Sequence, residues 1–192
     1  MASSTELLRS RLIAVRSDKV RMPGGNWAER DVVEHPGAVA VLALDDADRV
    51  LMIRQYRHPV GRLLWEIPAG LRDVPGEDPW VTAGRELLEE AGHVADEWHV
   101  LVDYFTSPGF STERLRVFLA RGLKEVPEEE RTYVLEDEET TLERAWLPLQ
   151  EAVRMVFAGD LHNGVAAMGI LAAHAAQSDG FAGLRPADSP EA

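Results

Sequence analysis

The chain alternates between short apolar runs and clusters of turn residues, and this pattern predicts most of its elements. The longest apolar run, at 38–44, reads AVAVLAL and contains no polar position. A run without alternation is typical of a strand that is covered on both faces. A second run, at 50–53, follows a turn formed by Asp45, Asp46 and Asp48. We therefore expect 38–44 and 50–53 to form a hairpin.

The N-terminal part carries a more polar hairpin pattern. Residues 12–15 begin its first strand, a turn cluster follows at 22–26, and 27–34 returns the chain. Further strands are expected at 98–104 and 115–120, and Trp146-Leu147-Pro148 should end the last strand. The default expectation for the aromatic residues Trp27, Tyr56, Trp65 and Phe110 is a place in the core, and the alternative is that one of them stacks on a ligand.

Helical spacing of apolar residues occurs in three segments. In the first, Pro79 suits the first turn and Gly92 suits the residue just past the end, with a broken apolar stripe of Val81, Leu87, Leu88 and Ala91 between them. The other two helices are expected at 150–157 and 163–176. Strands thus dominate the first two thirds, with one helix inserted and two following, which indicates an α+β fold.

The domain organisation follows from the same pattern. We expect a single domain over 1–176, without internal repeat or linker. The segment 177–192 is rich in Gly, Pro, Ser and Asp, so we expect it to be a disordered tail.

Composition narrows the class of protein. A length of 192 residues suits one domain, and a net charge of −13 argues against non-specific nucleic-acid binding, which needs a basic surface. No apolar run approaches the roughly 18 residues of a spanning helix, and the N-terminus lacks the apolar segment of a secretory signal. The absence of cysteine excludes disulfides and thiolate chemistry. We therefore expect a cytoplasmic protein that contacts no membrane.

The first helix carries an unusual group of charges. Glu86, Glu89 and Glu90 share one face, because residues three and four apart are neighbours on a helix. Like charges there repel each other, and they also meet the negative end of the helix dipole. Arg85 can neutralise one of them. A solvated acidic face is one interpretation; a bound divalent cation such as Mg²⁺, which prefers oxygen ligands, is the other.

The surroundings of this helix favour the cation. The stretch 70–93 resembles the Nudix box, usually written G-x5-E-x7-R-E-U-x-E-E-x-G-U with U an aliphatic residue. The matching positions are Glu77, Arg85, Glu86, Leu87, Glu89, Glu90 and Gly92. There are two departures: six residues separate Gly70 from Glu77 instead of five, and His93 takes the last aliphatic position.

The flanks resemble one group within this family, the ADP-ribose pyrophosphatases, over roughly 10–176. The resemblance lies in the segments RQYR at 54–57, EIPAG at 66–70 and SPGFSTE at 107–113, where Pro108 lies about sixteen residues past the box. It implies an α/β/α sandwich of mixed sheets, with the box helix and the C-terminal helices on its faces. It also implies hydrolysis of ADP-ribose to AMP and ribose 5-phosphate with Mg²⁺ or Mn²⁺.

The resemblance assigns roles to individual residues. The Ala69 carbonyl, Glu86 and Glu90 resemble metal ligands, and Glu89 a further ligand or a supporting group. Arg85 resembles the arginine that orients these carboxylates. Arg57 matches the phosphate-contacting position. From the residue types alone, Arg54 and Arg57 could clamp an anion at the end of their strand, and the alternative is a solvent-facing edge. Gly70 and Leu71 lie where the family's backbone approaches the substrate, and Glu113 resembles the acid that reaches the terminal ribose.

The resemblance also implies a base and a dimer. A carboxylate before the last strand activates water in this group, and Glu139 occupies that place, with Glu138 as the alternative. Relatives form homodimers by exchanging N-terminal strands, here 1–35, so that Trp27 and Arg30 would reach the site of the other copy. The alternatives are a Nudix diphosphatase for a sugar nucleotide, flavin dinucleotide or dinucleoside polyphosphate, and a non-catalytic domain that senses ADP-ribose.

Overall fold

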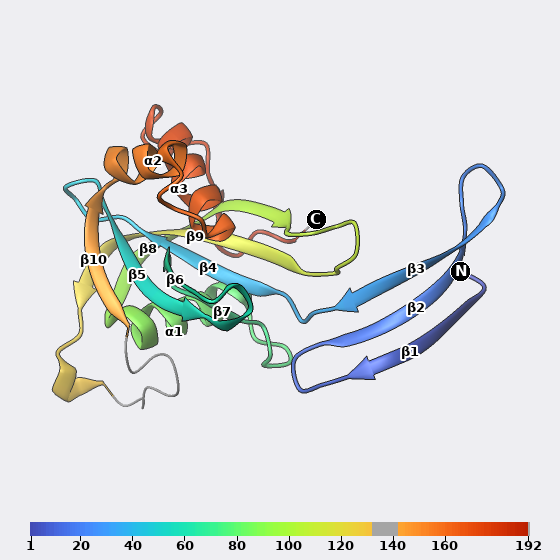
Figure 1. Ribbon diagram of the computed structural model, residues 1–192. Coiled ribbons are helices and arrows are strands. Elements are labelled where there is room, and N and C mark those ends of the chain that lie inside the picture. Colours follow the sequence, from blue (N-terminus) through green and yellow to red (C-terminus); the bar gives the residue numbers. More distant parts are fainter. Residues whose placement is uncertain (132–141, 192) are drawn as a thin grey trace.

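The computed structural model describes residues 1–131 and 142–191, which form a body with a projecting arm (Figure 1). The strands are β1 Ser3–Arg9, β2 Ala14–Arg21, β3 Trp27–Glu34, β4 Ala38–Ala43, β5 Arg49–Arg57, β6 Arg62–Glu66, β7 Ala69–Leu71, β8 His93–Phe105, β9 Arg114–Glu125, β10 Glu143–Pro148 and β11 Arg185–Pro186. The α-helices are α1 Pro79–Ala91, α2 Leu149–Ala158 and α3 Gly164–Gln177. Within these described ranges, no helix has the length and apolar character needed to span a membrane.

The body is built around β4, the continuous apolar strand. It pairs in parallel with β9 and antiparallel with β7 in a sheet ordered β11-β8-β9-β4-β7. Its alternate residues belong to two separate buried clusters: Leu42 packs with side chains of α2 and α3, and Val41 packs with side chains of α1. Helices therefore cover both faces, which confirms the expected α+β sandwich of mixed sheets (Figure 1).

The expected hairpin of 38–44 with 50–53 is wrong. β5 belongs to a second sheet ordered β10-β5-β6. It pairs with the chain after β4 at the turn, through a bridge between Leu44 and Val50 and a hydrogen bond from the Asp45 N–H to the Arg49 carbonyl. A strand buried on both faces needs a hydrogen-bonding partner at each edge, and β9 and β7 take both edges of β4. The apolar runs predicted the strands, but they carry no information about which strand pairs with which.

Helix α1 begins at Pro79 and ends before Gly92, whose φ of 68° is the left-handed conformation that favours glycine. The position of the helix confirms the prediction, but its buried face differs from the expected stripe. Glu86 and Glu90 are buried alongside Leu87, whereas Val81 is 40% exposed. Arg144 donates from Nε to the Glu90 carbonyl at 2.7 Å, which places a positive charge at the negative end of the helix.

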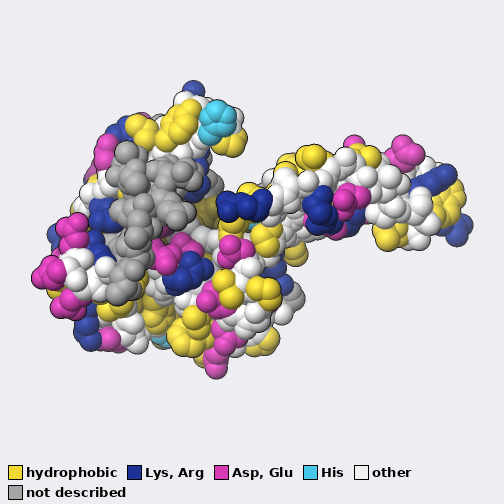
Figure 2. Space-filling view, turned by 90° about the horizontal axis from the view of Figure 1, so that it is seen from below, with side chains coloured by type: hydrophobic (Ala, Val, Ile, Leu, Met, Phe, Trp, Pro, Cys, Tyr) yellow, Lys and Arg dark blue, Asp and Glu magenta, His cyan; other side chains and the backbone are white. Residues whose placement is uncertain are grey.

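The arm is a three-stranded antiparallel sheet, β1-β2-β3, that stands clear of the body (Figures 1 and 2). The hairpin of β2 with β3 confirms the prediction, but regular structure starts earlier than expected, at Ser3. Every residue of β1 is exposed. The expected core place is also wrong for three aromatics, since Trp27, Tyr56 and Phe110 are each about half exposed or more.

The segment after α3 is ordered in the structure, contrary to the expectation of a disordered tail. Phe181 is buried in the core, and β11 pairs with His99 and Val100 of β8. The fully buried Arg116 donates to the carbonyl of Ser189 at 2.7 Å. The polar composition of the segment indicated that water would surround it. Composition could not show that the buried guanidinium of Arg116 on β9 binds the backbone of this segment.

Candidate functional site

Two carboxylates of α1 are buried beside β7. Glu86 is 8% exposed and Glu90 is 4% exposed, and the backbone N–H of Ala69 donates to Oε2 of Glu90 at 2.8 Å. Buried carboxylates are rare unless they are paired or bind a metal. The helix and the short strand therefore bring Ala69 close to the box carboxylates that the sequence analysis grouped with it.

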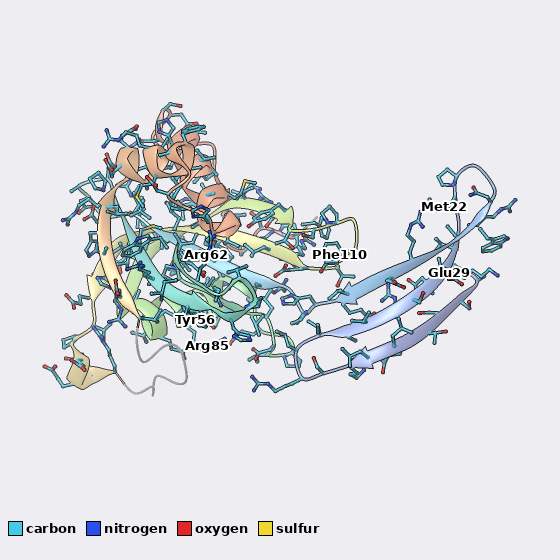
Figure 3. The ribbon with its side chains drawn as sticks, viewed as in Figure 1. Met22, Glu29, Tyr56, Arg62, Arg85 and Phe110 are labelled. Atoms are coloured by element: carbon cyan, nitrogen blue, oxygen red, sulfur yellow. The ribbon has the colours of Figure 1, made fainter. Side chains whose placement is uncertain are left out.

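Arg85 links the carboxylates of this helix. Its Nη1 donates to Oε1 of Glu86 at 2.8 Å and to Oε2 of Glu89 at 3.0 Å. Glu77 lies 3.7 Å from Nη2 of Arg85. Burial alone would lower the pKa of Arg85, but the charges of Glu86 and Glu89 outweigh it and raise the pKa. The guanidinium therefore stays charged and offsets the repulsion between the acids (Figure 3).

Gly70 packs closely on Glu86, which brings the backbone of β7 next to the acids that could bind a cation. A Cβ at Gly70 would collide with the Glu86 carboxyl group, so the backbone there can approach the acid only because the residue is glycine. The available donors are carboxylate oxygens and the Ala69 carbonyl, which are the ligands of hard divalent cations. This donor set fits a divalent cation, although within the described residues no three such side chains are already grouped to hold one.

A pocket of about 600 Å³ opens along β7, whose residues Ala69 and Gly70 contact Glu90 and Glu86; these two acids do not themselves line it. It has the size of a small-molecule site. The residues that line it include Arg57, Glu66, Ala69, Gly70, Leu71 and Glu113. The sequence analysis had named all of them except Glu66, although the five come from β5, β7 and the residue just before β9. Figure 2 shows acidic and basic side chains mixed on the nearby face of the body.

Arg57 reaches this pocket as half of a bidentate pair. Its Nε and Nη2 donate to the two oxygens of Glu66 at 2.9 and 2.6 Å. Glu66 is 2% exposed, so its charge fixes the arginine in one orientation. The sequence analysis gave Glu66 no role, although an acid inside the apolar stretch LLWEIPA could have drawn attention to a buried ion pair.

The expected clamp of Arg54 with Arg57 does not form. Residues three apart on a strand point to opposite faces, and Arg54 lies near Glu143, with Nη1 and Oε2 separated by 3.4 Å. Its guanidinium also lies over the ring of Trp65. Arg54 lines a separate pocket of about 410 Å³ together with Arg62 and His162.

The remaining predicted residues lie elsewhere. Trp27 and Arg30 are on β3, next to Glu29 towards the free end of the arm (Figure 3). Glu138 and Glu139 lie outside the described residues. His35 and Asn163 line the main pocket, and the sequence gave no signal for either of them.

Comparison with known proteins identifies the class. Residues 34–166 match the NUDIX domain family. The chain therefore belongs to the Nudix family of hydrolases, whose members generally use divalent metal ions.

Individual relatives can be named. An "ADP-ribose pyrophosphatase" of Mycobacterium tuberculosis (strain ATCC 25618 / H37Rv) is 50% identical over 97% of this chain and 88% of its own length. A protein of the same name from Bacillus subtilis (strain 168) is 37% identical over 86% of each chain. The "Methanol dehydrogenase activator" of Bacillus methanolicus is 38% identical over 79% of each chain.

A solved structure described as an ADP compounds hydrolase matches the fold. Its TM-score is 0.78 over 93% of this chain and 94% of its own. At 22% identity, this likeness supports the fold alone.

Proposed function

We propose that the chain hydrolyses the pyrophosphate bond of ADP-ribose and releases AMP and ribose 5-phosphate. The observation that carries this proposal is the pocket, which Arg57, Glu113 and β7 line, while Ala69 and Gly70 of β7 also contact the buried acids of α1. A cationic group suits the phosphates, and an acceptor-only carboxylate suits the hydroxyls of a sugar. The relatives named ADP-ribose pyrophosphatase support the same substrate.

The proposed metal is Mg²⁺, with Mn²⁺ as the alternative. Glu86, Glu90 and the Ala69 carbonyl would hold it, and Glu89 would ligate it or support the other acids. When bound, such a cation neutralises charge that develops on the phosphate oxygens. Arg85 keeps the acids of α1 in place through its bonds to Glu86 and Glu89.

Arg57 would bind a phosphate oxygen while Glu66 holds its guanidinium. An arginine whose orientation is already fixed loses less freedom when it binds the anion than a mobile one does. Gly70 and Leu71 would present backbone to the same part of the substrate, since they line the pocket beside Arg57. Arg54 has no place in this pocket, so we no longer assign it to the phosphates.

Glu139 is the proposed base, with Glu138 as the alternative. The base takes a proton from a water molecule, which attacks the adenosine-side phosphorus and displaces ribose 5-phosphate. Removing such a base costs about 10²–10⁴ in rate. Glu139→Gln should therefore show that loss in kcat, with Glu138→Gln as the matched variant. If Glu139→Gln kept full activity, the assignment to Glu139 would be wrong.

The arm supports a further proposal, that two copies form a homodimer by exchanging their N-terminal strands. Leu7, Leu8 and Trp27 are each more than half exposed on a sheet that no helix of the described chain covers. Exposed apolar surface of this kind marks an interaction site. Trp27 and Arg30 would then reach the pocket of the other copy. The proposed location is the cytoplasm, which suits a chain without cysteine.

Product analysis tests the substrate. The purified chain is incubated with Mg²⁺ and separately with ADP-ribose, GDP-mannose, flavin dinucleotide and diadenosine polyphosphate. GDP-mannose is included because relatives named GDP-mannose pyrophosphatase are 30% identical over 71% of this chain. We expect AMP and ribose 5-phosphate from ADP-ribose and none after chelation of the metal. Cleavage of another compound alone would overturn the substrate, and tight binding of ADP-ribose without any turnover would indicate a sensor.

A further inference from the structure

The end of the pocket that bears Glu113 lies where the pairing of β8 with β9 ends. Phe105 pairs with Arg114 at the end of the register, and the Thr106 N–H then donates to the Glu113 carbonyl at 3.3 Å. Directly opposed residues in an antiparallel pair point to the same face. Leu115, two residues beyond Glu113, lines the pocket as well. Thr106 and Glu113 therefore face the pocket together.

The Glu113 carboxylate is held on one side only. Oγ1 of Thr106 donates to Oε2 of Glu113 at 2.5 Å. Nδ1 of His35 lies 3.8 Å from Oε1, but this nitrogen already accepts the Gly37 N–H at 3.1 Å, so in this arrangement it has no proton to give. Among the described residues, Thr106 is thus the side chain that donates a hydrogen bond to Glu113.

The backbone of this region does not depend on that bond. The loop between β8 and β9 is fixed to the root of the arm: Val33 donates to the Phe110 carbonyl at 2.7 Å, and Thr112 donates to the Val33 carbonyl at 2.9 Å. Figure 3 shows Phe110 at this junction. The His35 N–H also donates to Oγ1 of Thr112 at 3.0 Å. Loss of the Thr106 hydroxyl should therefore free the carboxylate and leave the loop in place.

We propose that Thr106 is a positioning residue that orients Glu113 towards the hydroxyls of the sugar. The inference rests on the proposed function and deepens it. A carboxylate with one oxygen already bonded presents the other, Oε1, as an acceptor that is restricted in rotation. Neighbouring sugar hydroxyls are donors that match such an acceptor. Thr106 thus makes the pocket selective for a substrate whose second moiety is a sugar with a free vicinal diol.

Tyr104 provides a matched control on the same face of the sheet as Thr106. It lies two residues before Thr106 on β8, so its side chain is on the same face. Its hydroxyl is buried and has no hydrogen-bond partner within the described residues. Burial, together with the negative charge of Glu113, raises the pKa of Tyr104 to about 12. Tyr104→Phe removes a hydroxyl close to Glu113 that makes no bond to it.

The experiment compares Thr106→Val, Thr106→Ser and Tyr104→Phe with the unmodified chain. The substrates are ADP-ribose and its analogue that lacks the 2-hydroxyl of the terminal ribose. Loss of a hydrogen bond of typical net strength implies a rise of about 5–10-fold in KM for ADP-ribose in Thr106→Val, with kcat little changed. KM for the deoxy analogue should stay the same. Thr106→Ser and Tyr104→Phe should behave like the unmodified chain.

Three outcomes would overturn the assignment of Thr106. The first is an unchanged KM for ADP-ribose in Thr106→Val, and the second is an equal rise for both substrates, which would indicate general damage to the pocket. The third is failure of Thr106→Ser to restore KM while it unfolds at the normal temperature. The activity of the unmodified chain distinguishes failure of the Thr106 proposal from failure of the proposed function. If the unmodified chain turned over no ADP-ribose, the proposed function would be wrong, and the role of Thr106 with it.

Discussion

Strands β4 and β1 show how differently one chain can use the same element. Every residue of β4 is buried, because helices cover both faces of its sheet and neighbours occupy both of its edges. Every residue of β1 is exposed, because its sheet has no covering layer in the described chain. β1 nevertheless contains Leu7 and Leu8, both more than half exposed. Packing, and not strand formation, therefore separates the body from the arm.

The comparison bears on where the function resides. In the body, packing fixes polar groups: Arg57 is held by Glu66, and Ala69 is held by Glu90. In the arm, Trp27 is 52% exposed, and Arg30 donates to the carbonyl of its neighbour Glu29 at 2.8 Å, so no packed layer holds either side chain. A site needs side chains whose orientations are fixed by neighbours. The body of one chain can supply such a site, whereas the arm would contribute to one only in the proposed dimer.

The largest expected effect comes from truncating one leucine in each region. Leu87 of α1 is fully buried, whereas Leu7 of β1 is 59% exposed. Leu87→Ala should lower the free energy of unfolding by about 2–5 kcal/mol, because it leaves a cavity. Leu7→Ala should change it by less than about 0.5 kcal/mol in dilute solution. Urea denaturation monitored by tryptophan fluorescence measures both, and equal losses would contradict the contrast.

A smaller effect is expected where the C-terminal segment meets the body. Nε and Nη2 of Arg116 donate to Asp103 at 2.6 and 2.9 Å. Asp103→Asn should cost about 1–3 kcal/mol at pH 7, since it weakens the bonds of a buried guanidinium. Burial alone would raise the pKa of Asp103, but hydrogen bonds from Arg116 and Arg185 outweigh it and lower the pKa.

The pH dependence of this effect has a definite sign. Because the pKa of Asp103 is lower in the folded chain, its contribution is present above the unfolded value of about 3.9. The contribution is lost as the pH falls through the folded pKa. The difference in unfolding free energy between the unmodified chain and Asp103→Asn should therefore shrink below about pH 4. A constant difference from pH 7 to pH 3 would show that the pair does not act through its charge.

Removal of 185–192 tests the same contact from the other side. The deletion removes the Ser189 carbonyl from Arg116 and the Glu191 carboxylate from Arg72, where the ion pair measures 2.7 Å. We expect a loss of about 1–3 kcal/mol in unfolding free energy, because buried donors lose their partners. Thermal unfolding followed by circular dichroism would detect it. An unchanged midpoint would restore the expectation of a tail that does not contribute to stability.

The smallest effect on stability is expected in the arm. Trp27→Ala should alter the unfolding free energy by less than about 0.5 kcal/mol, because the side chain is half exposed. If the proposed exchange of strands occurs, the same change should weaken self-association in sedimentation velocity and raise KM for ADP-ribose. A monomer at all concentrations before the change would contradict the proposed dimer.

The sequence predicted the elements of the body better than their pairing. Pro79, Gly92 and the apolar period defined α1, since caps and periodicity are local signals. The pairing of β4 with β9 joins residues far apart in the chain, and no local pattern specifies it. The order of the C-terminal segment depends on Arg116, whose burial is a property of the whole fold.

For the candidate site too, the sequence predicted some residues and missed others. The resemblance brought Arg57, Ala69, Gly70, Leu71 and Glu113 together, and all of them line one pocket. The clamp of Arg54 with Arg57 came from the residue types alone, and the alternation of side chains along β5 contradicts it. Glu66 and Thr106 were missed because each acts through another residue, and such contacts become visible only when strands are paired.

The most direct test concerns the buried acids of α1. Glu90→Gln keeps an oxygen that can accept the Ala69 N–H, so the fold should persist, while the negative charge is lost. Glu97→Gln, at an exposed position on β8, is the matched control. We expect the rate of AMP release from ADP-ribose to fall by about 10²–10³-fold in Glu90→Gln and to stay unchanged in Glu97→Gln. Full activity of a folded Glu90→Gln chain would contradict the placement of the site on α1.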